Sequence, residues 1–129
     1  DFTEAGGYQA MKQLLALSHP PTAVITANNL MTNGALRALG EAKVRLPDDI
    51  SLISFDDFDF ATLMNPPISV ISRDARIQGS QAMELMMRHL DSGAATQPEH
   101  SRVDVHLIER GSCAPPRESQ KIRSNKDDN

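Results

Sequence analysis

The stretch SLISFDDFDF (residues 51–60) changes character halfway, because an apolar run fit for a buried strand ends in three carboxylates. An earlier stretch, TAVITANNLM (residues 22–31), also begins apolar and then breaks into two asparagines. Ligands of open parallel sheets bind beyond the carboxyl ends of the strands. The two polar ends therefore predict two parts of one binding site.

Helical spacing surrounds the earlier stretch. Thr3 is expected to cap a helix that begins at Glu4, because its hydroxyl can accept a backbone N–H of the first turn. Residues 22–26 predict a short, fully buried strand, and Asn29 is the predicted cap of a second helix with apolar residues on one face. A helix, a strand and another helix thus precede the acidic stretch.

The alternation of strands and helices continues to the end of the ordered sequence. Asp74 is the predicted cap of a long helix over residues 75–91, which Gly93 closes. We expect the methionine-rich face of this helix to pack in the core. Short apolar runs predict further strands at 50–55, 68–72 and 103–109. This order is typical of an α/β fold with a parallel sheet and flanking helices.

The composition fits one soluble domain. The chain has 129 residues, of which 40% are hydrophobic, and we expect a folded domain over residues 1–112 and a disordered polar tail over 113–129. The formal net charge of −4 argues against a nucleic-acid-binding surface, which is usually basic. The first residue is Asp rather than Met, so we interpret the chain as a piece of a longer protein.

Cysteine and histidine usage points away from several kinds of site. Cys113 is the single cysteine, which fits a reducing, cytoplasmic setting without an intrachain disulfide. The four histidines lack metal-ligand spacing, and no phosphate-binding glycine motif is present. These patterns argue against a zinc site and a phosphate-binding loop, and we expect no cofactor.

Asn28 and Asp56 are the two candidates for ligand contact, since each follows directly after a predicted strand. An amide offers a donor and an acceptor, and a carboxylate offers acceptors only. Such a set suits a polyhydroxylated molecule such as a sugar. Asn28 fits a simple turn residue equally well on this pattern.

Asp57 and Asp59 have a structural and a chemical interpretation. The structural one is that either carboxylate caps the helical turn that follows. The chemical one is a magnesium-dependent phosphatase, because DFDFAT (residues 57–62) contains the Asp-x-Asp of haloacid-dehalogenase-type enzymes. That motif continues with Gly-Thr, which this sequence lacks, so the capping role is favoured.

Five short motifs, in one order, resemble the C-terminal part of LacI/GalR-family transcription regulators. Each is weak alone, but together they cover residues 1 to about 116 and are highly specific. They are the DF of residues 1–2, TAVITANNLMTNGALRAL (22–39), RLPDDISLISFDD (45–57), PPISVIS (66–72) and LIERGSCAPP (107–116).

The resemblance implies a periplasmic-binding-protein-like type I fold of two lobes, with a small effector, commonly a sugar, between them. Asn28 and Asp56 match the family's effector-contacting Asn and Asp, and Phe2 matches the aromatic residue that stacks on the effector. Two departures are Asn29, where an Asp is usual, and Ala75, where several members carry a larger residue. The latter predicts a roomier pocket.

The resemblance also implies partners for the parent protein. It would be a cytoplasmic homodimer, often a repressor, that binds DNA only through an N-terminal headpiece absent from this chain. The resemblance implies that the chain itself catalyses no reaction. The family dimerises partly through the segments matching residues 32–42 and 58–67, so Met31, Leu63 and Met64 are candidate contacts, although core packing fits each of them equally well. In family members, the helix and the strand that correspond to residues 75–91 and 103–109 pack in the N-terminal lobe. The rival interpretation is the sugar-binding protein of a transporter, which shares this fold.

Overall fold

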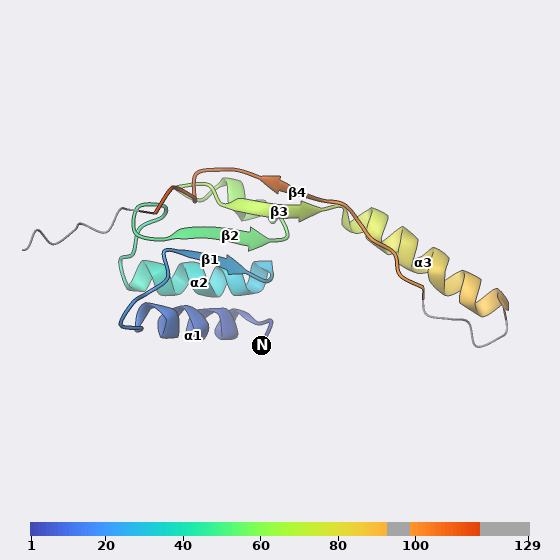
Figure 1. Cartoon of the computed structure of the whole chain (residues 1–129), viewed down its shortest axis with the longest axis horizontal. Coiled ribbons are helices and arrows are strands. Elements are labelled where there is room, and N and C mark those ends of the chain that lie inside the picture. The colour runs from blue at the N-terminus through green and yellow to red at the C-terminus, as the bar shows by residue number, and fades with distance from the viewer. Residues whose placement is uncertain (93–98, 117–129) are drawn as a thin grey trace, which may run out of the picture.

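A computed structural model describes residues 1–92 and 99–116, and shows a four-stranded sheet with helices (Figure 1). The order of strands across the sheet is β1-β2-β3-β4; β1, β2 and β3 are parallel and β4 is antiparallel to β3. The predicted α/β class is confirmed, and the predicted end at Gly93 lies outside the described residues. The elements are α1 (Glu4–Leu15), β1 (Ala23–Thr26), α2 (Asn29–Glu41), β2 (Ser51–Phe55), the 3-10 turn η1 (Asp59–Thr62), β3 (Ser69–Arg73), α3 (Ala75–Ser92) and β4 (Val105–Ile108).

The helix caps agree with the sequence in two places and differ in one. Thr3 caps α1 by accepting the N–H of Gly6 at 3.0 Å, and Asp74 caps α3 by accepting the N–H of Arg76 at 2.8 Å. The prediction that Asn29 caps α2 is wrong. Asn28 has the extended backbone of a cap residue, and its Oδ1 accepts the N–H of Met31, three residues on, at 2.8 Å.

Helices α1 and α2 touch through their backbones at two glycines. A Cβ atom placed on Gly7 would lie 2.3 Å from the carbonyl oxygen of Met31, and one on Gly34 would lie 2.0 Å from that of Glu4. Both distances are shorter than any real contact of a side-chain carbon. Only glycine therefore allows these helices to lie this close.

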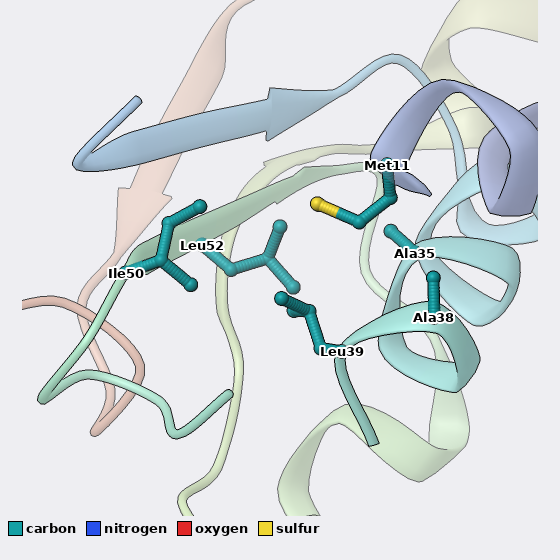
Figure 2. Packing of buried hydrophobic residues seen from close by; sticks show 6 residues of the cluster. All are labelled: Met11, Ala35, Ala38, Leu39, Ile50 and Leu52. Atoms are coloured by element: carbon teal, nitrogen blue, oxygen red, sulfur yellow. The ribbon is translucent and has the colours of Figure 1, made fainter. Parts of the chain in front are cut away.

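The core lies between β2 and the two helices (Figure 2). Leu52 points from β2 toward Leu39 of α2 and Met11 of α1, and all three side chains are almost fully buried. Ala35, Ala38 and Ile50 complete this cluster. Ile50 and Leu52 both enter this cluster because successive side chains of a strand point to opposite faces, so every second one points toward the helices.

The opposite face of the sheet carries no helix among the described residues. Ile25 of β1 is 64% exposed, and its register partner Ile53 is only partly buried. The prediction that residues 22–26 are fully buried is therefore wrong. The physical reason is that β1 is an edge strand whose side chains on this face have no layer to pack against.

Helix α3 projects away from the sheet (Figure 1). The prediction that its methionine-rich face packs in the core is wrong for the described chain. Leu90 is 68% exposed, and the other large apolar side chains of the helix are exposed by about half: Ile77, Met83, Met86 and Met87. The spacing that predicted an amphipathic helix is present, but no described element covers its apolar side.

Strand β4 joins the same sheet as β1, β2 and β3. Val70 of β3 pairs with Ile108, and Arg73 pairs with Val105. The resemblance implied that residues 103–109 pack in another lobe, and the structure differs because the free edge of β3 offers the backbone donors and acceptors that β4 needs. The side chains of β4 remain exposed.

Beyond β4 the chain returns to β2. The Ser112 hydroxyl is fully buried; it donates to the carbonyl of Leu52 at 2.6 Å and accepts the N–H of Ser69 at 2.8 Å. The Ala114 N–H donates to Ser51 Oγ at 3.1 Å. These contacts reach two residues into the predicted tail, whose remainder from 117 lies outside the described residues. No helix among the described residues is long and apolar enough to span a bilayer.

Candidate functional site

Phe2 and Asn28 lie together at the carboxyl end of β1. The side-chain amide of Asn28 donates from Nδ2 to the carbonyl oxygen of Phe2 at 3.2 Å, while its Oδ1 caps α2. The Phe2 side chain is exposed. The cap thus fixes the orientation of Asn28 and leaves one N–H and one lone pair of its amide for a further partner.

A buried network of hydroxyl groups connects the ends of β1 and β2. Thr32 Oγ1 lies 2.6 Å from Thr26 Oγ1 and 2.7 Å from Ser54 Oγ, and all three residues are buried. Thr32 Oγ1 also lies 2.8 Å from the carbonyl oxygen of Asn28, and Ser54 Oγ lies 3.3 Å from that of Asp56; each hydroxyl has one proton and donates to one of these neighbours at a time. The backbone carbonyls of both predicted site residues therefore border the same buried group of hydroxyls.

Asp56 occupies an unusual backbone conformation. Its φ of 69° lies in the left-handed region, where Asp and Asn are among the few non-glycine residues found. The Asp56 N–H donates to the carbonyl of Ile71 at 3.0 Å, which ties the residue to β3. A backbone held in this region is often associated with a functional site.

Arg73 is a member of this cluster that the sequence did not indicate. It ends β3, and its guanidinium binds both carboxylate oxygens of Asp56, with Nε–Oδ1 at 2.7 Å and Nη2–Oδ2 at 3.2 Å. Its Nη1 also contacts the side-chain oxygen of Gln78. The hydrogen bonds that Arg73 donates to the Asp56 carboxylate raise the pKa of Arg73 above its ordinary value. The only signal was the position of an arginine at a strand end.

Asp57 and Asp59 do not cap the following turn, so that prediction is wrong. The cap position of η1 is Phe58, which makes no side-chain cap. Asp57 instead accepts two hydrogen bonds from Arg110, at 2.8 and 3.0 Å, and these lower the pKa of its carboxyl below the ordinary value. Arg110 also donates to the carbonyl of Ile68 at 2.9 Å, which fastens the chain after β4 to the sheet.

The arrangement of carboxylates offers little support for metal chemistry. Asp57 is committed to Arg110, while Asp59 belongs to the first turn of η1. Within residues 1–92 and 99–116, no three His, Cys, Asp or Glu side chains are grouped so that they could hold a metal ion. The strand ends instead present an amide, a carboxylate, a guanidinium and an aromatic ring.

Comparisons with known proteins agree with the fold of this chain. Residues 1–113 match the periplasmic binding protein-like domain. The ribose operon repressor of Escherichia coli K12 is 37% identical over 115 residues, which cover 88% of this chain and 34% of the repressor. The chain thus spans about a third of the length of the curated relatives it matches.

Two solved structures have the same fold. A LacI family transcriptional regulator from Bifidobacterium animalis subsp. lactis is 34% identical with a TM-score of 0.72, covering 90% of this chain and 42% of that one. A LacI family regulator from Enterococcus faecium with bound ribose is 28% identical with a TM-score of 0.71, covering 89% and 42%. The chain therefore belongs to the periplasmic binding protein-like domain family, and its structural relatives include LacI-family transcriptional regulators.

Proposed function

We propose that this chain is part of the effector-sensing region of a LacI-type transcriptional regulator, and that Phe2, Asn28 and Asp56 contact a sugar-like effector. The observation that carries the proposal is the gathering of these residues at one edge of the sheet. The carbonyl of Phe2 accepts a hydrogen bond from Asn28 directly, and the backbone carbonyls of Asn28 and Asp56 both border the buried group of hydroxyls.

The chemistry of this edge suits a sugar ring. The exposed ring of Phe2 offers a flat apolar surface for the C–H face of a sugar. The free N–H of Asn28 and the remaining lone pairs of Asp56 offer partners for hydroxyl groups. The relative from Enterococcus faecium holds ribose, which makes a neutral sugar the first probe to use.

The parent protein would be a cytoplasmic repressor that binds DNA through a headpiece and forms a homodimer. Leu63 and Met64 are exposed. Met64, Leu36 and Pro66 are among the residues that line an open pocket of about 520 Å³. This apolar surface supports a dimer contact there. Met31 is a poorer candidate, because its backbone lies under Gly7 of α1. Relatives named as transcriptional repressors favour a regulator over a transporter's binding protein.

The test is a sugar titration of the chain followed by amide NMR, with ribose, glucose and galactose as probes. We expect at least one sugar to shift the amide signals of Phe2, Asn28 and Asp56. Asp56→Asn keeps a residue that tolerates the left-handed backbone and removes the charge. It should weaken binding by roughly 1.5–3 kcal/mol, the scale of a hydrogen bond to a charged group.

Asp59→Asn is the matched control, because Asp59 lies three residues further along in η1. It should leave the affinity unchanged. Equal affinity of the Asp56→Asn variant and the unmodified chain would contradict the assignment of Asp56. No localised shift with any of the three sugars would contradict the proposed function.

A further inference from the structure

Arg73 and Asp56 form a rigid unit at the carboxyl ends of β2 and β3. Phe55 and Ile71 are register partners, and the pair lies just beyond them. Two N–H groups of the guanidinium meet two carboxylate oxygens, a geometry that fixes both groups in one plane. The side chains remain accessible, with 30% of Asp56 and 32% of Arg73 exposed.

The neighbouring pair of Asp57 and Arg110 has a similar geometry but different surroundings. The Arg110 side chain is only 15% exposed, and it also donates to the backbone carbonyl of Ile68. That pair fastens the chain after β4 to the sheet. The Arg73 side chain, at 32%, is about twice as exposed as that of Arg110. The pair of Asp56 and Arg73 also lies on the edge that carries the other site residues.

The pair has donors and acceptors left for a ligand. A guanidinium has five N–H groups, and Arg73 uses two on Asp56 and one on Gln78. The carboxylate of Asp56 has about four lone-pair positions and gives two to Arg73. An acceptor and a donor thus lie side by side. Two adjacent hydroxyl groups match them, because one can donate to the carboxylate while the other accepts from the guanidinium.

We infer that Arg73 is a specificity-determining residue of the effector site, and that the pair of Asp56 and Arg73 selects a neutral ligand with vicinal hydroxyl groups over an anion. This inference rests on the proposed function. Asp56 compensates the positive charge of Arg73, so an anion would gain little from the guanidinium and would meet a carboxylate beside it.

The experiment compares two arginines of the full 129-residue chain. Arg73→Gln removes the bidentate partner of Asp56, and Arg73→Lys keeps the charge but cannot form the two parallel hydrogen bonds. Arg76→Gln is the control, because the Arg76 side chain is 95% exposed and lies near the same strand end. Each variant is titrated with ribose, glucose, galactose and inorganic phosphate, and thermal unfolding shows whether the fold is kept.

We expect a neutral sugar to shift the Nε–H signal of Arg73 together with the amide of Asp56. Both Arg73 variants should bind that sugar about tenfold more weakly, the scale of one charge-assisted hydrogen bond. The Arg76 variant should bind it normally. Inorganic phosphate at the same concentrations should leave the Arg73 signal in place.

Three results would contradict the inference, and they are distinguishable. Equal sugar affinity in the Arg73 and Arg76 variants would show that Arg73 takes no part, while the proposed function would stand. A larger shift of the Arg73 signal with phosphate than with any sugar would show that the site selects anions. No localised shift with any sugar would remove the proposed function and this inference together.

Discussion

The chain contains two regions that both carry helices with apolar residues at helical spacing, but these helices pack differently. The body (residues 1–73 and 105–116) buries Leu52 and Leu39 almost completely, while the arm (residues 75–92 and 99–104) leaves Leu90 exposed. Helices α2 and α3 both carry apolar side chains at helical spacing. The comparison shows that spacing predicts an apolar face, but only a facing layer of structure decides whether that face is buried.

The largest expected difference between the two regions is in hydrogen exchange. Amides of β2 should open only with the whole body, whereas those of α3 lie in a helix with almost no tertiary contacts. Exchange measured by NMR should be at least about a thousandfold faster in α3, given a body stability of about 5 kcal/mol or more. Equally slow exchange in both regions would show that the arm is packed in solution.

The same leucine truncation should have different costs in the two regions. Leu52→Ala removes a fully buried side chain and should lower the free energy of unfolding by about 2–5 kcal/mol. Leu90→Ala should change it by less than about 0.5 kcal/mol, because the side chain is already in solvent. Urea unfolding of both variants measures the difference. A large cost for Leu90→Ala would mean that the arm contributes to the cooperative core.

Serine substitutions give a similar test with hydrogen bonds. Ser112→Ala leaves the N–H of Ser69 and the carbonyl of Leu52 without their buried partner, so we expect a loss of about 1–3 kcal/mol. Ser101 donates a hydrogen bond to Gln81 in the arm and is exposed. Ser101→Ala should therefore be nearly neutral in the same unfolding measurement. Equal losses would indicate that the arm is as well ordered as the body.

The smallest expected difference is in pH dependence. Arg110 lowers the pKa of Asp57, so the folded chain binds this proton less tightly than the unfolded chain. The pair therefore stabilises the fold above about pH 4, the ordinary pKa of Asp, and this contribution is lost as the pH falls through the lower folded value. We expect about 1 kcal/mol at most, because Asp57 is about a third exposed and the pair is screened.

Thermal unfolding of Asp57→Asn and the unmodified chain between pH 6 and about pH 3 measures this contribution. The two stabilities should converge as the pH falls. Glu99→Gln is the control from the arm, because its partner Arg88 and Glu99 itself are about half exposed. That variant should follow the unmodified chain at every pH. A constant difference between Asp57→Asn and the unmodified chain would contradict the assigned role of the Asp57 carboxyl.

The sequence predicted the elements of the body and part of its candidate site. Polar residues after apolar runs indicated Asn28 and Asp56, whereas Phe2 came only from the family resemblance. Arg73 was missed because its contact with Asp56 spans 17 residues and depends on the register of β2 against β3. The buried hydroxyl network was missed for the same reason, since it connects β1, α2 and β2.

The close backbone contacts of Gly7 with Met31 and of Gly34 with Glu4 have a mechanical consequence for the proposed sensor. Side chains between two helices can change rotamer and absorb a small displacement, but at these two glycines the backbones meet with no side chain between them. Phe2 precedes α1 by two residues, and Asn28 begins α2 as its cap. If the proposed effector contacts Phe2, a displacement of α1 would therefore be passed to α2 at these two points.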